Sequence, residues 1–307
     1  MIVVAGESLV DLSVAADGSV TATPGGGPYN VARSLGRLGI PVAFLGRLSD
    51  DRFGQILRRE LIADGVDLAL ATETDEPTLL AVAEVDDDGA ASYRFHTVGT
   101  AAVGLTPEHV AHGLPRGTTA VHVGTLGLVL EPMASTIAAL VAELPGDVLV
   151  MADLNCRPSA IADPAGYRAR LARVLARTDV VKASTDDLAW LDPGADLVEA
   201  ARRLLELGPA VVLLTDGGRP ARVVTRADVV SVVVPATPVV DTIGAGDAFG
   251  AGFLASWTAA GRSRAELADL PAVVGATRFG VQVGSRTAGR AGANPPTLAE
   301  LGLTGPG

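Results

Sequence analysis

The stretch Asp241-Thr242-Ile243-Gly244-Ala245-Gly246-Asp247 stands directly before a run of small residues that is expected to form a helix over 248–260. Glycines leave several backbone N–H groups able to point at one spot, and the N-terminus of a helix adds partial positive charge. The stretch therefore favours binding of an anion. Asp247 falls within the first helical turn. A carboxylate there can take part in catalysis, or it can be no more than a favourable residue at a helix start.

Two familiar phosphate-binding loops do not fit this stretch. The Walker pattern requires a glycine followed by lysine and Ser or Thr, yet Lys182 is the sole lysine of the chain and lies elsewhere. The dinucleotide fingerprint requires a third glycine three residues after the second, and Phe249 occupies that place. Pro235 and Pro238 also separate the stretch from the preceding apolar run. A P-loop is excluded and a nicotinamide enzyme is disfavoured.

Apolar runs of strand length recur along the chain, with helical spacing of apolar residues between them. This alternation is typical of βαβ units that build a mostly parallel, buried sheet. Gly39 and Gly208 stand where two of the helices should end. The fold class is therefore α/β. The clearest expected strands are 3–5, 121–123, 148–151, 180–181 and 211–214, and helices are expected around 31–38, 53–61 and 197–205.

Residues 10–23 and 72–98 break this rhythm, because apolar and polar side chains alternate there, as from Leu79 to Val85. Asp86-Asp87-Asp88-Gly89 is expected to turn the chain between two strands. The pattern indicates hairpins set apart from the parallel core. They form either an edge of the same sheet or a small separate lid.

A second glycine-rich stretch, Pro24-Gly25-Gly26-Gly27-Pro28-Tyr29-Asn30, opens the helix expected to run through Leu38. Three consecutive glycines are costly in backbone entropy, which suggests unusual dihedrals or close approach of a ligand. Asn30 lies in the first helical turn, and its amide offers donors and an acceptor that suit the hydroxyls of a polyol. A tight turn with nothing bound is the alternative.

Composition excludes several classes of protein. The 307 residues are 48% hydrophobic and 19% charged, which fits an ordinary globular chain rather than a disordered one. A net charge of −11 without a basic run argues against nucleic acid or an anionic membrane as partner. Cys156 is the only cysteine, so neither an intramolecular disulfide nor a cysteine zinc cage can form. No export signal is evident at the N-terminus, and the expected location is the cytoplasm.

Both glycine-rich stretches resemble the two signatures of the ribokinase-type (PfkB) carbohydrate kinases, in the correct order and about 215 residues apart. The resemblance extends from Gly6-Glu7 to Gly292-Ala293-Asn294-Pro295-Pro296. It implies one ribokinase-like domain over 1–307, built as a three-layer α/β/α sandwich with a mostly parallel central sheet. Residues 10–23 and 72–98 would then form a small β lid, through which such proteins sometimes form homodimers.

The resemblance assigns the catalytic roles. Asp247 matches the base that accepts the proton of the attacking hydroxyl, and the amides of Gly244, Ala245 and Gly246 match those that hold the transferring phosphoryl oxygens. These roles suit phosphoryl transfer, which depends mainly on positioning and charge stabilisation. Arg157, in a stretch similar to the Asp-x-Asn-x-Arg of fructokinases and ketodeoxygluconate kinases, would lie between sugar and phosphates. A surface ion pair is the alternative for Arg157.

Binding roles follow from the same resemblance. Asp187 occupies the position of a family glutamate that serves Mg²⁺ through water, although Ser184 replaces the usual asparagine. A monovalent cation, K⁺, is an open possibility near Asp241 and Ile243. The sugar-binding positions are Asp11, Gly26, Gly27, Asn30, Arg94 and Asp247, and the ATP-binding positions are Lys182, Thr215, Gly217, Gly244, Gly246, Gly292 and Asn294.

Phosphofructokinase-like members of the family carry a lysine in the first glycine motif, which holds the phosphate already on their substrate. This chain has Gly27-Pro28 there and no lysine, so the resemblance implies an unphosphorylated sugar. The segment Ser92-Tyr93-Arg94-Phe95-His96 looks most like a fructokinase lid, so ATP-dependent phosphorylation of fructose is the leading hypothesis. A 2-keto-3-deoxy sugar acid is the alternative, since Arg94 and Arg157 could both approach a carboxylate. Ribose, a nucleoside, or a binding protein without catalysis also stay open.

Overall fold

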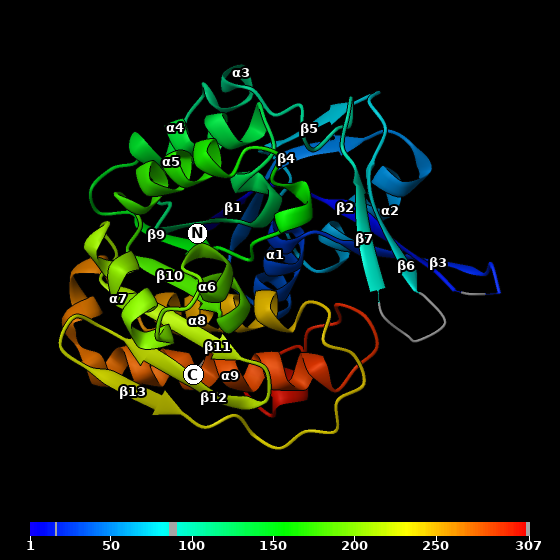
Figure 1. The fold of residues 1–307 in the computed structure, drawn as a ribbon. Helices are drawn as coiled ribbons and strands as arrows, with labels where there is room; N and C mark the ends of the chain where they lie inside the picture. Colours follow the sequence, from blue (N-terminus) through cyan, green and yellow to red (C-terminus); the bar gives the residue numbers. More distant parts are fainter. Residues whose placement is uncertain (16, 86–90, 305–307) are drawn as a thin grey trace.

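A computed structural model describes residues 1–15, 17–85 and 91–304 of the chain (Figure 1). Its larger sheet has the order β13-β12-β11-β10-β9-β8-β1-β4-β5, and only β12 and β13 pair antiparallel to their neighbours. The expected mostly parallel sheet is confirmed. Its strands are β1 (Ile2–Ala5), β4 (Val42–Ser49), β5 (Ala71–Thr74), β8 (Ala120–Gly124), β9 (Leu149–Asp153), β10 (Val180–Ser184), β11 (Val211–Asp216), β12 (Arg219–Val224) and β13 (Val229–Val232).

Helices cover both faces of this sheet because its strands are apolar on both sides. Ile2 and Val4 of β1 pack toward one helix layer, whereas Val3 and Ala5 pack toward the other, as alternation along a strand requires. The first layer contains α1 (Gly27–Arg37), α2 (Arg52–Ala63), α8 (Ala245–Ala259) and α9 (Leu270–Ala288). The second contains α4 (Met133–Ala142), α5 (Pro164–Leu175), α6 (Thr185–Leu191) and α7 (Leu197–Glu206), with the short α3 (Pro107–Val110) beside it.

A smaller sheet stands apart from the three layers, in the order β3-β2-β6-β7 (Figure 1). Its strands are β2 (Leu9–Val14), β3 (Val20–Gly25), β6 (Leu79–Val85) and β7 (Ala91–His96). Residues 72–74 of the segment expected in it belong instead to β5, which pairs with β4 in the larger sheet. The expected turn at Asp86-Asp87-Asp88-Gly89 lies outside the described residues.

Helix α8 begins at Ala245, three residues earlier than the run of small residues predicts. Gly244 precedes it with φ 73°, a left-handed conformation that glycine adopts without a Cβ clash. The early start places Asp247 at the third helical position. Among the described residues, no helix is long and apolar enough to cross a membrane.

Candidate active site

A smaller and a larger cavity lie side by side where parallel strands of the larger sheet end. The smaller cavity has a volume of about 430 Å³ and is lined by residues that follow β1 and β8, by β2, and by the start of α8. The larger has about 710 Å³ and extends over the ends of β10 and β11. The carboxyl edge of a parallel sheet is the usual binding edge of α/β proteins. Both cavities are lined by Asn155, Arg157, Lys182, Thr242 and Gly246.

Asp247 lines the smaller cavity, and the residue is 7% exposed. Its Oδ2 accepts a hydrogen bond of 2.8 Å from Nδ2 of Asn30 on α1. Burial raises the pKa of the Asp247 carboxyl. The hydrogen bond from Asn30 and the positive charges of Lys182 and Arg157 oppose this rise by favouring the ionised form. The carboxylate is thus oriented by one neighbour and has few competing solvent contacts.

The start of α8 also offers backbone N–H groups to a ligand. Gly246 and Asp247 lie in the first turn, where an α-helix offers no intrahelical acceptor for an N–H group. The N–H of Ala245 instead donates to the carbonyl oxygen of Thr242 at 3.2 Å. Of the expected anion-binding amides, that of Ala245 therefore already has a partner, and Gly246 is better placed to receive an anion.

Asn30 and Gly27 bring the first glycine motif to the same cavity. The Oδ1 atom of Asn30 is buried and has no hydrogen-bond partner among the described residues, so it can accept from a bound hydroxyl. A Cβ atom on Gly27 would lie 2.2 Å from Oγ1 of Thr125 and 3.6 Å from Oδ1 of Asp247. Gly26 adopts φ 108°, which is open to glycine, and a Cβ there would meet the backbone of Glu7.

Asp11 on β2 and Arg157 after β9 both line this cavity, and their opposite charges interact. Burial raises the pKa of Asp11 to about 6, while the charge of Arg157 lowers it and that of Asp247 raises it further. The Nη1 atom of Arg157 donates to the carbonyl oxygens of Asn155 and Cys156, at 3.3 and 3.2 Å. Because Arg157 lines both cavities, its guanidinium can reach groups bound in either.

Lys182 on β10 forms a buried ion pair with Asp153 on β9, with Nζ 3.1 Å from Oδ1. Burial lowers the pKa of the Lys182 ammonium. The negative charges of Asp153, Asp187 and Asp247 outweigh burial and leave that pKa raised. A Cβ atom on Gly246 would lie 2.9 Å from the ammonium nitrogen. A fixed positive charge therefore lies against the N-terminus of α8.

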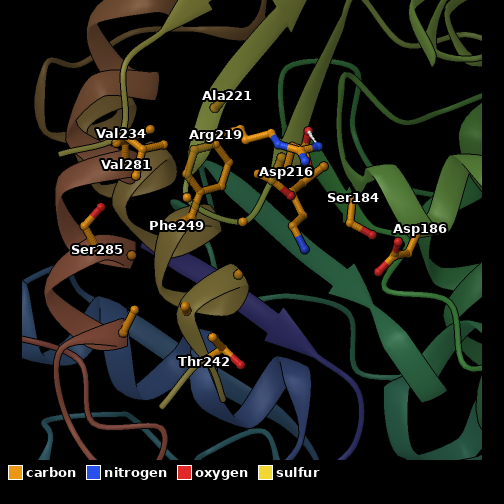
Figure 2. A pocket seen from close by; sticks show the side chains of 18 of the residues that line it. Ser184, Asp186, Asp216, Arg219, Ala221, Val234, Thr242, Phe249, Val281 and Ser285 are labelled. Atoms are coloured by element: carbon orange, nitrogen blue, oxygen red, sulfur yellow. Dashed lines mark hydrogen bonds and ion pairs between the residues drawn. The ribbon is translucent and has the colours of Figure 1, made fainter. Parts of the chain in front are cut away.

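The larger cavity combines an apolar part with a polar part. Figure 2 shows Val234, Val281 and Phe249 together on one side and Ser184 and Asp186 on the other. The expected residues Thr215 and Gly217 both line this cavity. Gly217 adopts φ 53°, so the chain turns tightly after β11. An apolar slot beside polar groups and a helix N-terminus is suited to a planar base that carries phosphates.

Asp187 lines the larger cavity, but both of its carboxylate oxygens already accept hydrogen bonds. Oδ1 accepts from the N–H of Cys156 at 2.6 Å, and Oδ2 accepts from the N–H and hydroxyl of Ser184 at 2.7 and 2.8 Å. Within the described part of the chain, no cluster of three or more His, Cys, Asp or Glu could hold a metal ion directly. Through the hydrogen bond from Cys156, Asp187 fixes the loop that carries Arg157.

Asp241 joins two loops that the sequence places far apart. Its Oδ1 accepts from the N–H of Ile243 at 3.0 Å, and its Oδ2 accepts from the N–H of Gly292 at 2.9 Å. Ile243 also lines the smaller cavity. Gly292 and Asn294, expected at the nucleotide, line neither cavity, although the neighbouring Ala293 packs against Gly244. These residues support the loop before α8.

Arg94 is not brought to the smaller cavity. Phe95 lines that cavity, and consecutive residues of a strand point to opposite faces of a sheet. Arg94 of β7 is accordingly exposed on the other face. A direct contact of Arg94 with a molecule in this cavity is therefore not supported by its placement.

Glu7, Thr125 and Asn155 are among the residues that line the smaller cavity and carry no role in the sequence-based predictions. Asn155 belongs to the stretch similar to Asp-x-Asn-x-Arg, so its position there was the available signal. Glu7 is fully buried and accepts hydrogen bonds from the N–H groups of Gly27 and Gly127, which no local pattern reveals. Burial raises the pKa of Glu7 to about 7, against the opposing effect of these backbone bonds.

Comparison with known proteins bears on the chemistry of this site. The model of the pfkB family carbohydrate kinases matches residues 1–299. The chain is 35% identical to a fructokinase from Rhizobium leguminosarum bv. trifolii, over 83% of this chain and 79% of that protein. It is 36% identical to a fructokinase from Klebsiella pneumoniae, over 84% of each.

Solved structures show the same architecture. A fructokinase from Xylella fastidiosa with bound ATP is 27% identical, with a TM-score of 0.88 over 98% of this chain and 96% of that one. A double-mutant fructokinase from Vibrio cholerae O395, bound to fructose, ADP and a potassium ion, is 25% identical, with a TM-score of 0.86 over 98% and 97%. The expected three-layer fold and the family resemblance of both motifs are confirmed. The chain therefore belongs to the pfkB family of carbohydrate kinases.

Proposed function

We propose that this chain is an ATP-dependent fructokinase that transfers the γ-phosphoryl group to a hydroxyl of unphosphorylated fructose. One observation carries the proposal: Asp247 lines the smaller cavity, while Gly246 beside it lines both cavities. A hydroxyl near Asp247 and a phosphoryl group near the N-terminus of α8 would thus be adjacent. The fructokinase relatives support fructose as the acceptor.

The proposed reaction assigns one task to each group. The Asp247 carboxylate accepts the proton of the sugar hydroxyl as that oxygen attacks phosphorus. Donors at the start of α8, with Arg157 and Lys182, stabilise the negative charge on the transferring phosphoryl group. Asp11, Asn30, Gly26 and Gly27 hold the sugar, and the slot at Val234 and Phe249 holds the base of ATP. A sugar acid is the weaker candidate, because Arg94 faces away from the cavity.

Metal ions enter the proposal through the nucleotide. Mg²⁺ is usually held by water and substrate phosphates, and when bound it neutralises phosphate charge. Asp187 fits this arrangement through Oδ1, which accepts one hydrogen bond and retains a lone pair that can accept from metal-bound water. A monovalent cation would be held near Asp241 and Ile243, at the loop before α8; a potassium ion in the structure of the Vibrio cholerae relative supports this part of the proposal.

Release of ADP over a panel of ketoses, aldoses, sugar acids and nucleosides tests the proposed function. We expect turnover to be highest with fructose, to be lost when EDTA removes Mg²⁺, and to fall when tetramethylammonium replaces K⁺. Equal turnover of a sugar acid would reassign the substrate. A panel without turnover, combined with sugar binding in calorimetry, would instead identify a binding protein.

We also propose that the whole chain is one domain in which the smaller sheet acts as a lid. Leu9, Asp11 and Ser13 of β2, Ala83 of β6 and Phe95 of β7 line the smaller cavity, so this sheet forms one of its walls. Closure over bound substrates would exclude water from the transfer. Small-angle X-ray scattering should show a smaller radius of gyration with fructose and a non-hydrolysable ATP analogue than without them. Identical profiles would contradict closure.

A further inference from the structure

Two residues that line the smaller cavity have strained backbones. Thr125 has φ 52° and Asn155 has φ 33°, and among the described residues they are the non-glycine residues with positive φ. Asparagine tolerates the left-handed region, but a β-branched residue such as threonine is a genuine outlier there. Strain of this kind persists only where the surrounding structure imposes it, and it is concentrated at functional sites.

The two side chains form a pair at the ends of neighbouring parallel strands. Thr125 directly follows β8 and Asn155 follows β9. Nδ2 of Asn155 donates to Oγ1 of Thr125 at 3.2 Å. Because Oγ1 already accepts this bond, the hydroxyl proton of Thr125 remains available, and no acceptor for it is found among the described residues. Thr125 is 6% exposed, so its hydroxyl has few alternative contacts with water.

The Thr125 hydroxyl lies close to the reacting end of the cavity. The position that a Cβ of Gly27 would occupy is 2.2 Å from Thr125 Oγ1 and 3.6 Å from Asp247 Oδ1. A Cβ at position 27 would clash with Oγ1, so the glycine allows the threonine hydroxyl to lie against the backbone on the side of the cavity that also holds the carboxylate. A sugar that presents one hydroxyl to Asp247 in this cavity would bring its neighbouring oxygen toward Thr125.

Glu7 holds the strained segment in place. Its Oε1 accepts from the N–H of Gly27 at 3.1 Å, and its Oε2 accepts from the N–H of Gly127 at 2.9 Å. Gly127 belongs to the 3₁₀ helix Thr125–Leu128, so one buried carboxylate fixes both walls of the cavity next to Thr125. The strain at Thr125 is thereby imposed by contacts outside its own side chain.

We propose that Thr125 is a specificity-determining residue, whose hydroxyl donates to the sugar oxygen adjacent to the phosphorylated one and is aimed by its strained backbone and by Asn155. The proposal rests on the proposed kinase function. It predicts that the residue is retained at a cost in stability, because a glycine would adopt the same backbone without strain.

The first test compares Thr125→Gly with Thr225→Gly, a matched change at a half-buried threonine with negative φ outside both cavities. Thr125→Gly should raise Tm, or leave it unchanged, while it raises KM for the sugar about tenfold and leaves KM for ATP within about twofold. Thr225→Gly should lower Tm and leave both KM values unchanged. A clear loss of Tm in Thr125→Gly would make the residue structural and overturn the proposal.

The second test combines Thr125→Gly with monodeoxy analogues of the best substrate of the panel. The unaltered chain should discriminate by about tenfold in kcat/KM against the analogue that lacks the oxygen next to the phosphorylated one. Thr125→Gly should remove this discrimination and leave that against the other analogues unchanged. Thr125→Ser keeps the hydroxyl and should keep the discrimination. If the effects of Thr125→Gly and of each missing hydroxyl on kcat/KM simply added for every analogue, the contact would be refuted and the kinase function would stand. A panel without any turnover would refute the kinase function, whereas the Tm comparison would still test the strain.

Discussion

Replacing Asp247 with asparagine is expected to lower kcat by about 10³-fold or more, because the variant has no group that can accept the proton of the attacking hydroxyl. The change is nearly isosteric, and the carbonyl oxygen of the new amide can still accept from Asn30. Sugar and nucleotide should therefore bind to a correctly folded site. The measurement is ADP release at saturating fructose and ATP, with Tm and KM values for comparison.

The matched control for this prediction is Asp147→Asn, an exposed aspartate outside both cavities. It should leave kcat unchanged. The kcat of the unaltered chain should fall as the pH drops through the pKa of Asp247, which burial raises above its ordinary value, because a protonated carboxyl cannot act as the base. A variant Asp247→Asn with full turnover would exclude Asp247 as the base.

The sequence predicts well those parts of the site that depend only on residues adjacent in the chain. A glycine-rich turn followed by a helix predicts an anion site wherever it occurs, so the placement of Gly246 and Asp247 follows from a few adjacent residues. Apolar strands on both faces likewise predict a buried parallel sheet. The start of α8 was placed too late because a left-handed glycine at position 244 ends the turn earlier than composition suggests.

The parts that the sequence does not predict depend on contacts between distant segments. Glu7 reaches Gly27 and Gly127 across 20 and 120 positions, and no periodic pattern encodes such a bond. The backbone strain at Thr125 has the same origin, since threonine by itself favours extended conformations. The face of the sheet on which Arg94 lies was also not predicted. A one-residue shift along a strand moves a side chain to the opposite face of the sheet.

Replacing Lys182 with methionine is expected to reduce both stability and turnover. The substitution leaves Asp153 buried without its ion-pair partner, and breaking a buried pair typically costs about 3–5 kcal/mol in the free energy of unfolding. It also removes the positive charge that lies against Gly246, so we expect kcat to fall about 10²-fold or more. Urea unfolding and ADP release at saturating substrates measure the two effects.

The double variant Asp153→Asn with Lys182→Met separates these effects. Replacing both charges by neutral groups of similar volume removes the uncompensated charge, so most of the lost stability should return. The kcat should stay low, because the charge near the phosphates is still missing. If kcat returned together with stability, Lys182 would act only by holding β10 against β9, and the stabilisation of the phosphoryl group would fall to Arg157 and the first turn of α8.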